Sequence, residues 1–245
     1  MGKAGRKRHA RTRRGPRPRG SRPLDRDVIL SAGLALTKSQ PLQDVSIVRV
    51  AQEFGVTPAS IHYYLDGRDT LTFGIINLFF RDLLSEWPIL TGVWSADLEA
   101  LAEVIYRHYV RYPGIAAYFA GQNRFRVLVQ SNRPRGEEHR FRFLERYFMA
   151  IDSVGLPARR GAVYALVLIQ FIIASAHATA NHQLPGEQRH IRTLLGAVEQ
   201  KEYPTIHQMR ASYLAVAGDD VFAAGIRVIL AGLQAERRKG GKSKR

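Results

Sequence analysis

Residues 46–65 read SIVRVAQEFGVTPASIHYYL, and the positions of the apolar residues, the glycine and the proline in this stretch decide the fold. Four apolar residues recur at the i, i+3, i+4 and i+7 positions of one helix face: Ile47, Val50, Ala51 and Phe54. Ser46 precedes them as the expected N-cap residue, and Gly55 follows where a helix commonly ends in the left-handed conformation. The pattern therefore predicts a helix that begins after Ser46 and ends at Gly55.

A second helix is expected to begin at Pro58, because proline is tolerated at the first helical position. We expect the Thr57 hydroxyl to accept hydrogen bonds from the free amides of the first turn, and Val56 to be buried in the turn. Ala51 is small enough to let two helices joined by so short a turn cross closely. This arrangement is typical of a helix-turn-helix, so the sequence predicts DNA binding.

The second helix, at about 100° per residue, directs Ile61, Tyr64 and Leu65 towards the core. Its outward face, which would enter a major groove, carries five residues: Thr57, Ala59, Ser60, His62 and Tyr63. No Arg, Lys, Asn or Gln occurs in residues 58–65, so this helix lacks the side chains that make bidentate contacts with bases. Arg49 is the nearest guanidinium, and we expect modest base discrimination that relies on methyl contacts and DNA shape.

Residues from about 24 to 77 resemble the N-terminal domain of TetR-family transcriptional regulators. The similarity covers LDRDVILSAGLAL as first helix, SIVRVAQEFGV as second, TPASIHYYL as recognition helix and GRDTLTFGII at the start of a fourth. The resemblance implies phosphate contacts at His62, where the family usually has Tyr, and at Arg68, where it usually has Lys. His62 would make its contact pH-dependent. Gln40-Pro41 also replaces the glycine usual after the first helix, so that loop is expected to differ.

The predicted DNA-binding residues combine the outward helix face, the positions that the resemblance implies, and two neighbouring residues, Arg49 and Tyr64. They are Arg49, Thr57, Ala59, Ser60, His62, Tyr63, Tyr64 and Arg68.

The charge of the chain lies in its two ends. Residues 1–22 carry ten Lys or Arg and residues 237–245 carry six, with no acid in either, which accounts for the formal net charge of +16. Residues 23–236 carry 21 basic and 21 acidic side chains. The composition of both ends predicts disorder. The first 22 residues either follow DNA phosphates and add salt-dependent affinity, which we favour, or form a solvated extension.

The chain of 245 residues is long enough for a small and a larger domain. We predict a disordered basic arm in residues 1–22, a helix-turn-helix domain in 23–70, a helical ligand-binding and dimerisation domain in 71–236 and a disordered basic tail in 237–245. The chain has no cysteine, which excludes disulfides and cysteine-based metal sites.

The most hydrophobic run, AVYALVLIQFIIASA in residues 162–176, is 15 residues long. Because a bilayer needs about 20 apolar residues, this run predicts a buried or interface helix and no membrane contact. No apolar segment resembling a signal peptide follows the basic N-terminus, so we expect a cytoplasmic protein.

The remaining sequence predicts an all-α protein of about ten helices, with a three-helix N-terminal domain and a larger helical domain. Beyond the N-terminal domain, helices are expected at 71–86, 98–109, 115–124, 139–153, 157–182, 190–202 and 219–237, with a polar loop, SNRPRGEE, at 131–138.

The C-terminal half resembles the TetR subfamily that has the tetracycline-repressor type of C-terminal domain. The residues are YRHYVRYPGIAAYF and YPTIHQMRASYLAVAGDDVFAAGIRVILAGLQA. The resemblance implies a homodimer, formed by a four-helix bundle of the two longest late helices, and a small-molecule pocket beneath them. The apolar character of residues 157–182 independently favours an interface position, although a purely core role stays open.

The small-molecule pocket is expected among polar-tipped or aromatic residues on helices. They are His108, Tyr112, Phe119, Gln122, Asn123, Arg126, Gln170, Phe171 and His177. We expect no metal site and no cofactor, since the sequence has no HExxH motif or carboxylate cluster. No arrangement of nucleophile, base and orienting group can be assembled, so an enzyme is not expected.

Two functions remain. The first is a repressor that binds a palindromic operator as a homodimer and is released by a small-molecule effector. The second is a constitutive architectural protein that binds DNA through its basic ends and whose larger domain only dimerises.

Overall fold

The computed structural model describes residues 24–121, 138–180 and 185–242. Within these ranges it contains eleven α-helices, one short 3₁₀ helix and no strand, which confirms the all-α prediction. The elements are α1 (Arg26–Leu36), η1 (Leu42–Asp44), α2 (Ile47–Glu53), α3 (Pro58–His62), α4 (Arg68–Ser85), α5 (Trp94–Arg111), α6 (Pro113–Gly121), α7 (His139–Asp152), α8 (Ala158–Ala180), α9 (Pro185–Gly196), α10 (Pro204–Ala215) and α11 (Gly218–Lys242). The predicted basic arm, most of the polar loop and the last residues of the tail lie outside the described ranges.

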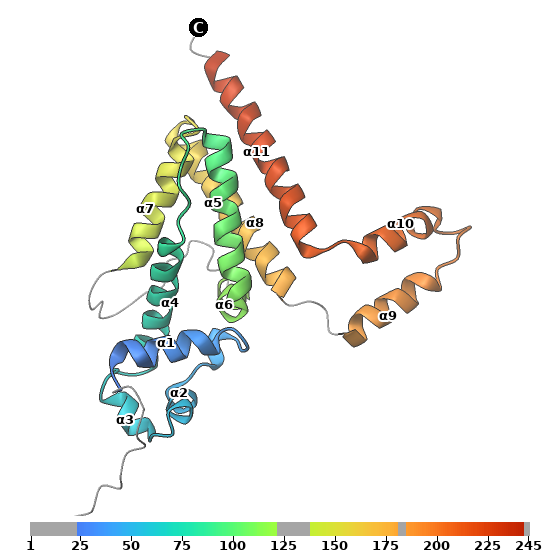
Figure 1. The fold of residues 1–245 in the computed structure, drawn as a ribbon. Coiled ribbons are helices and arrows are strands. Elements are labelled where there is room, and N and C mark those ends of the chain that lie inside the picture. The colour runs from blue at the N-terminus through green and yellow to red at the C-terminus, as the bar shows by residue number, and fades with distance from the viewer. Residues whose placement is uncertain (1–23, 122–137, 181–184, 243–245) are drawn as a thin grey trace, which may run out of the picture.

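The first three helices form a small unit at one end of the molecule, and α4 leads from it into the larger bundle (Figure 1). Asp25 caps α1 by accepting a hydrogen bond from the Val28 amide at 2.8 Å. Gly67, with φ of 120°, allows the chain to turn sharply into α4. A Cβ on Gly74 of α4 would overlap the Leu30 side chain, so glycine permits the close packing of α4 on α1.

The larger bundle is built around α5 and α8, which pack on each other and on α6, α7 and α11. α8 and α11 run antiparallel, because Thr179 at the end of α8 meets Gly218 at the start of α11, whereas Arg160 at the other end of α8 meets Glu236. Tyr106 of α5 stacks on Phe222 of α11 with ring centroids 3.8 Å apart. These contacts tie three helices into one core.

The two units touch directly where α6 begins. The Gly114 amide donates a hydrogen bond to the Thr37 carbonyl at 2.9 Å, just beyond the C-terminus of α1. A Cβ at this position would overlap the carbonyl oxygen of Gln40 and lie 2.8 Å from that of Thr37. Only glycine allows this approach of two backbones, so the α6 turn is fitted against the α1–η1 junction.

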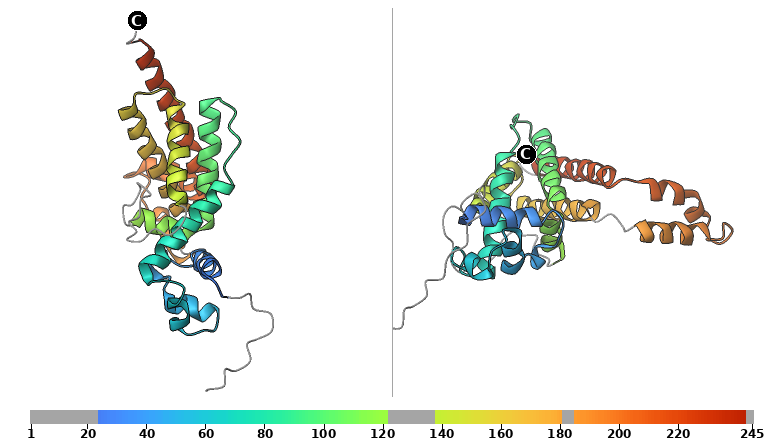
Figure 2. Two further views of the ribbon diagram at one scale, coloured as in Figure 1. Left: turned by 90° about the vertical axis from the view of Figure 1, so that its left-hand side faces the viewer. Right: turned by 60° about the horizontal axis from the view of Figure 1, so that its bottom comes forward.

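Helices α9 and α10 project sideways from the bundle as a separate pair (Figures 1 and 2). They pack on each other, and neither packs extensively on any helix of the bundle. We call residues 185–215 the arm. The arm connects α8 to α11, so its two ends leave the body at neighbouring points.

The helix boundaries differ from the sequence prediction mainly in and around the arm. The helix expected at 190–202 is α9, which begins at Pro185 and ends at Gly196. Helix α10 was not predicted separately, because none of its residues is buried and an exposed helix has no core-facing pattern. Helix α8 extends beyond the apolar run at 162–176 to 23 residues. By length and composition alone α8 could cross a membrane, but it packs against α5, α6, α7 and α11.

Candidate functional site

The helix-turn-helix forms by the local chemistry that the sequence indicates. The Ser46 hydroxyl caps α2 by accepting a hydrogen bond from the Arg49 amide at 3.1 Å. Gly55 has φ of 60°, the left-handed conformation in which a side chain would be strained. Ala51 is buried where α2 and α3 cross, and its carbonyl accepts a hydrogen bond from the Val56 amide at 3.1 Å. The predicted cap, helix end and small crossing residue are confirmed.

The start of α3 differs from expectation in one detail. Pro58 is the first helical residue, as predicted, but the Thr57 side chain makes no capping hydrogen bond to the backbone. Its hydroxyl lies 3.1 Å from the Ser60 hydroxyl instead. The capping prediction for Thr57 is therefore wrong, because a neighbouring hydroxyl within the first turn engages the side chain. Val56 is only half-buried, where burial was expected.

The recognition helix is short but its faces are those predicted. The α-helix proper ends at His62, and backbone hydrogen bonds from Tyr63 to Ala59 and from Leu65 to Ile61 extend it by three residues. Ile61 and Leu65 are buried. Tyr63 is 85% exposed, and its ring meets that of half-buried Tyr64 edge-on at 5.1 Å.

The outward residues form one exposed ridge. Thr57, Ala59 and His62 are exposed and Ser60 is half-buried. Hydroxyl, methyl, imidazole and phenol groups therefore alternate along about two turns, and this set can donate and accept hydrogen bonds and contact thymine methyls.

Two arginines flank this ridge, and both make contacts within the domain. Arg49 of α2 forms an ion pair with Glu53 at 2.9 Å and donates a hydrogen bond to Gln52 at 3.3 Å. Arg68, the first residue of α4, donates a hydrogen bond to the Gln43 carbonyl. The Arg49 ion pair is solvent-exposed and contributes little stability, so a phosphate could replace Glu53 at low cost.

The predicted pocket residues on α5 and α6 lie in the aromatic core. Phe119 and His108 are fully buried and Tyr112 is nearly so. The His108 Nε2–H donates a hydrogen bond to the Phe79 carbonyl at 3.0 Å, and Phe79 also packs against the ring of Tyr112. Burial lowers the pKa of His108, and the 3.5 Å between its Nδ1 and a Glu86 oxygen is too long for a strong ion pair. His108 is therefore neutral at neutral pH.

The other predicted pocket residues are not gathered around the same point. Gln170 is exposed on α8, Phe171 is half-buried against Gly225 of α11, and His177 is half-buried near the end of α8. Gln122, Asn123 and Arg126 lie outside the described residues. Two cavities lie elsewhere, one of about 390 Å³ between α9 and α10 and one of about 380 Å³ between α8 and α11. The assignment of the nine residues to one pocket stays a prediction.

Tyr109 carries a buried hydroxyl that the sequence did not single out. It lies on α5, is fully buried between Phe79 and Phe119, and its hydroxyl has no hydrogen-bond partner among the described residues. Burial raises the pKa of Tyr109, so the hydroxyl stays protonated. Its helical spacing marks Tyr109 as a core residue, and only the packing reveals an unpaired polar group, which normally requires a partner.

Comparisons with known proteins agree with this architecture. The sequence profile described as "Tetracyclin repressor-like, C-terminal domain" matches residues 90–237. The chain is similar to the HTH-type transcriptional repressor DrrR1 of Streptomyces coeruleorubidus, with 25% identity over 93% of this chain and 83% of that protein. It also shares 31% identity over 86 residues with the HTH-type transcriptional regulator BetI of Brucella abortus, which is 35% of this chain and 43% of that protein.

Solved structures show the same fold. Apo ActR from Streptomyces coelicolor superimposes with a TM-score of 0.68 at 20% identity, over 88% of this chain and 99% of that one. ActR in complex with actinorhodin superimposes with a TM-score of 0.67 at 21% identity, over 87% of this chain and 96% of that one.

A helix-turn-helix is joined through α4 to an all-helical second domain. This architecture defines a class of transcriptional regulators in which DNA binding and effector sensing lie in separate domains of one chain. The chain belongs to the TetR family of DNA-binding transcriptional regulators, in the branch with the tetracycline-repressor-like C-terminal domain.

Proposed function

We propose that the protein is a repressor that binds a palindromic operator as a homodimer and leaves it when a small molecule occupies the larger domain. The exposed ridge on α3 is the observation that carries the proposal, because only the apolar face of this helix is used for packing. The name of DrrR1 as a repressor supports the direction of regulation.

The ridge would enter the major groove, with Tyr63 and the Thr57–Ser60 hydroxyl pair contacting base edges. Arg49 and Arg68 would contact the flanking phosphates after exchanging their present partners. His62 and Tyr64 stand at the edge of the ridge, where they would contact the backbone of the DNA. Because the ridge has no guanidinium, we expect sequence preference to depend on several small contacts rather than on one dominant contact.

A homodimer is supported by exposed apolar side chains on the two longest helices. Val163 and Val167 of α8 are 54% and 41% exposed, and Val221 and Val228 of α11 are 50% and 72% exposed. Each pair is spaced at four or seven residues, so each lies along one helix face. The packed α8–α11 pair therefore presents an apolar surface that a second α8–α11 pair would cover as a four-helix bundle.

The α6–α1 junction supports a route by which effector binding in the larger domain would change the position of the recognition helix. Gly114 fixes the start of α6 on the end of α1, and α6 also packs against α8 in the larger domain. A ligand that moves α6 would therefore move α1 and the recognition helix. Since an operator requires two recognition helices about one DNA turn, roughly 34 Å, apart, a small rotation of each would weaken binding.

The effector we propose is an apolar, aromatic-rich small molecule with a hydrogen-bond acceptor. The buried rings of α4, α5 and α6 would stack on it, and the unpaired Tyr109 hydroxyl would donate to it. ActR, a protein of the same fold, has been solved in complex with actinorhodin, which supports an organic molecule as the effector.

Selection of bound sequences from a random DNA pool tests the proposal. We expect a palindrome whose half-sites are separated by one helical turn, and preference for it over random DNA that persists when residues 1–22 are deleted. A preference near unity after that deletion would favour the architectural protein. As a cytoplasmic regulator, the protein would need no catalytic activity, no cofactor and no membrane contact.

A further inference from the structure

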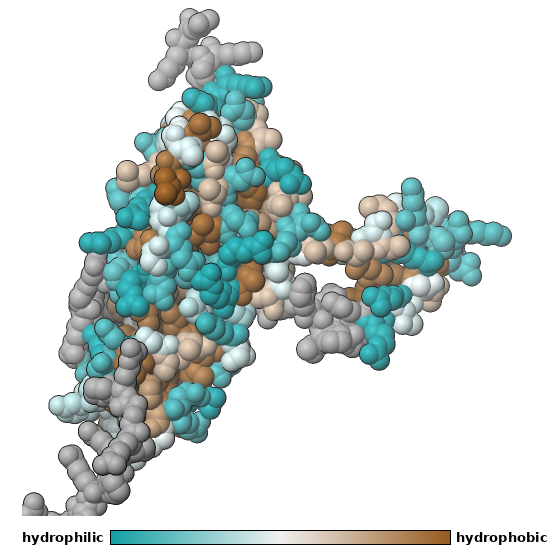
Figure 3. Space-filling model, viewed as in Figure 1, coloured by the Kyte–Doolittle hydropathy of each residue, from teal (hydrophilic) through white to brown (hydrophobic). Residues whose placement is uncertain are grey.

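The end of the body that lies opposite the recognition helix carries a concentration of exposed positive charge. Arg237, Arg238 and Lys239 follow one another on α11, and all three are exposed. Arg159 and Arg160, in the first turn of α8, are exposed as well. Because α8 and α11 run antiparallel, the start of α8 meets the end of α11, which gathers these cations at one end of the bundle. Figure 3 shows hydrophilic surface where the end of α11 leaves the body. We call the five residues the distal cluster.

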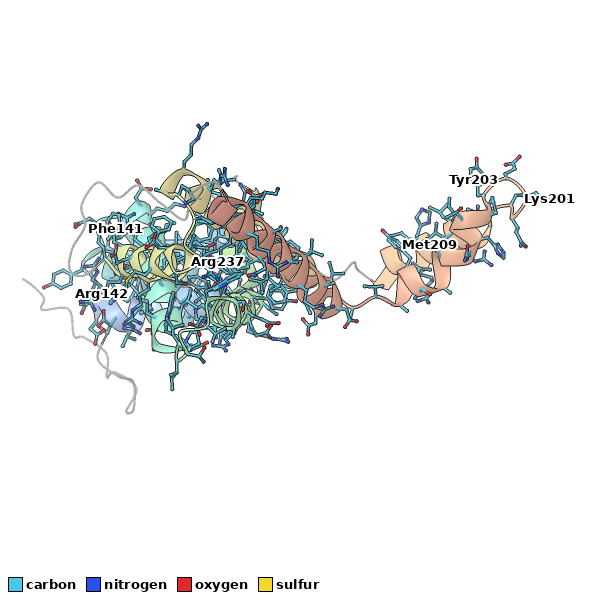
Figure 4. All side chains as sticks on the ribbon, turned by 90° about the horizontal axis from the view of Figure 1, so that it is seen from above. Phe141, Arg142, Lys201, Tyr203, Met209 and Arg237 are labelled. Carbon is cyan, nitrogen blue, oxygen red and sulfur yellow. The ribbon has the colours of Figure 1, made fainter. Side chains whose placement is uncertain are left out.

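The distal cluster lies at the end of the bundle that is farthest from α3. The opposite end of α8 lies towards the DNA-binding unit, because Thr179 contacts Tyr106 of α5, and α5 leads into α6, whose start is bonded to the end of α1. Figures 1 and 2 show the C-terminus and helices α1–α3 at opposite ends of the molecule. Figure 4 looks onto the distal end and shows Arg237 over the body, away from the arm. A straight duplex that contacts α3 is therefore out of reach of the distal cluster.

Helix α11 extends beyond the bundle at this end. The Arg160 guanidinium lies 3.4 Å from a Glu236 oxygen, which marks the level at which α8 begins. From there α11 continues to Lys242, a further six residues or about 9 Å at 1.5 Å per residue. The three cations on α11 are therefore presented on a projecting helix end that a second macromolecule can approach.

Contacts within the subunit use little of this charge. Glu236 pairs with two members of the cluster, at 3.4 and 2.8 Å. The other three, Arg159, Arg237 and Arg238, form no ion pair within the residues that the structure describes. Cations in the first turn of a helix also oppose the helix dipole, so the two arginines at the start of α8 do not stabilise that helix. The charge of the cluster is therefore available to an anion from outside the subunit.

The homodimer proposed above would bring two distal clusters together. Arg160 lies three residues before Val163 and seven before Val167, so it shares the α8 face that would meet the partner. Two copies of Arg159 and Arg160 would then lie near the two-fold axis, where four guanidinium groups repel one another. The hollow of about 380 Å³ between α8 and α11 is lined by both arginines and lies beside them. A bound polyanion would remove this repulsion.

The side chains of the distal end favour a nucleic-acid backbone over a protein or a bilayer. Four of the five cations are arginines, whose guanidinium can form two hydrogen bonds with one phosphate. Among the described residues, no large apolar side chain is exposed on α11 after Val228. Protein interfaces depend on buried anchors, and helices that lie on membranes have an apolar face. Charge alone is sufficient for sequence-independent binding of duplex DNA.

We propose that the distal cluster binds the phosphate backbone of a second DNA duplex, so that one dimer bridges two DNA segments. The recognition helix α3 would select the operator, and the distal cluster would hold another duplex without sequence preference. The inference rests on the homodimer of the proposed function for the pairing of two clusters, and it adds a contact that operator binding does not require. A regulator of this kind would hold two separate segments of DNA together.

A capture assay tests the bridge on the full chain. The palindrome selected from the random pool is immobilised on beads and loaded with protein, and a fluorescent duplex of unrelated sequence is added at low salt. The test variant is Arg237→Glu with Arg238→Glu. The matched control is Arg81→Glu with Lys201→Glu, two exposed cations on α4 and the arm that lie outside the distal cluster.

We expect the parent protein and the control to capture the second duplex and the test variant to capture at least fivefold less, while all three bind the palindrome equally. No capture by the parent, or equal capture by the test variant and the control, would overturn the inference. Deletion of residues 1–22 should leave capture in place, and its loss would assign the bridge to those residues instead. In each of these outcomes the palindrome is still bound, so the proposed function stands.

A second measurement does not depend on an operator. Tyr63→Ala with Arg68→Ala, in a chain that lacks residues 1–22, removes the main predicted contacts with the first duplex. Fluorescence anisotropy should show that this variant still binds a random duplex, and that adding Arg237→Glu and Arg238→Glu weakens the affinity at least fivefold. Equal affinities would contradict the inference, whether or not a palindrome is selected. Retention on phosphatidylglycerol vesicles without binding to the duplex would assign the distal cluster to a lipid surface and overturn the bridge.

Discussion

The Tyr106 hydroxyl lies 2.6 Å from Asp219 and 2.9 Å from Thr179, so one buried phenol joins three helices at the base of the arm. Burial and the hydrogen bond to Asp219 raise the pKa of Tyr106 to about 12, which keeps the phenol protonated as donor. Arg107 adds an ion pair to the other Asp219 oxygen at 3.0 Å. The group is therefore a paired polar network that extends from the buried Tyr106 phenol to the half-exposed side chains of Arg107 and Asp219.

Tyr106→Phe should lower the free energy of unfolding by about 1–3 kcal/mol, because it removes the hydroxyl and its hydrogen bonds to Asp219 and Thr179. Chemical denaturation measures the loss. A loss below about 0.5 kcal/mol would show that the network contributes little to holding the arm.

Tyr109→Phe is the matched opposite case. Its hydroxyl is buried without a partner in the part of the chain that the structure describes, so removing it should leave the stability of the free protein unchanged or raise it by about 1 kcal/mol. If the hydroxyl donates to the effector, the same variant should bind effector several-fold more weakly and require more of it to release DNA. Stability lost to the same degree as in Tyr106→Phe would instead point to a hydrogen bond within the protein.

The difference between these two tyrosines illustrates what the sequence could predict. Ser46, Gly55 and Pro58 act through their immediate neighbours, so cap, turn and helix start were predicted from spacing alone. Whether an aromatic residue on α5 faces a partner, a cavity or the core depends on helices far away in the sequence. The sequence therefore assigned His108 and Phe119 to a pocket without showing that both side chains are fully buried, and nothing distinguished Tyr109 from its neighbours.

The arm was the part of the fold that the sequence predicted least well. Helix α10 buries no residue within its own subunit, so its pattern has no core-facing stripe. Apolar residues do recur in the sequence at positions 206, 209, 213 and 216. Only the structure, in which the arm projects from the bundle, shows that these side chains are exposed.

Gly114→Ala should separate the α6 turn from the α1–η1 junction, because the new methyl would overlap the Gln40 carbonyl. Overpacking of this kind costs about 1–3 kcal/mol of stability. Gly121→Ala is the control, since a Cβ there meets none of the described residues within 4 Å. DNA affinity measured with and without effector should show weaker coupling in Gly114→Ala only. Unchanged coupling in a folded Gly114→Ala variant would exclude this junction as the route.

The stability of the protein should fall as the pH drops below about 6.5, through His108. Burial lowers the pKa of His108 in the folded state, while in the unfolded chain it stays near 6.5. The unfolded state therefore binds the proton first, and each pH unit below 6.5 removes at most about 1.4 kcal/mol. Glu86 partly offsets the effect and Arg111 reinforces it. Denaturation curves between pH 7 and 5 should be less pH-dependent for His108→Gln. Equal slopes in variant and parent would assign the acid sensitivity to other groups.

Tyr63→Ala and Arg68→Ala should weaken DNA binding in different ways. Tyr63 is 85% exposed on the ridge, so its loss should change which bases are preferred, by about 1–3 kcal/mol at the contacted position. Arg68 would contact phosphate, so its loss should weaken binding similarly on all sequences and reduce the salt dependence by about one counterion. Binding selections with both variants, with Val48→Ala as an exposed control on α2, separate the two roles. If Arg68→Ala changed the preferred sequence and Tyr63→Ala did not, α3 would lie in the groove with a different face towards the bases.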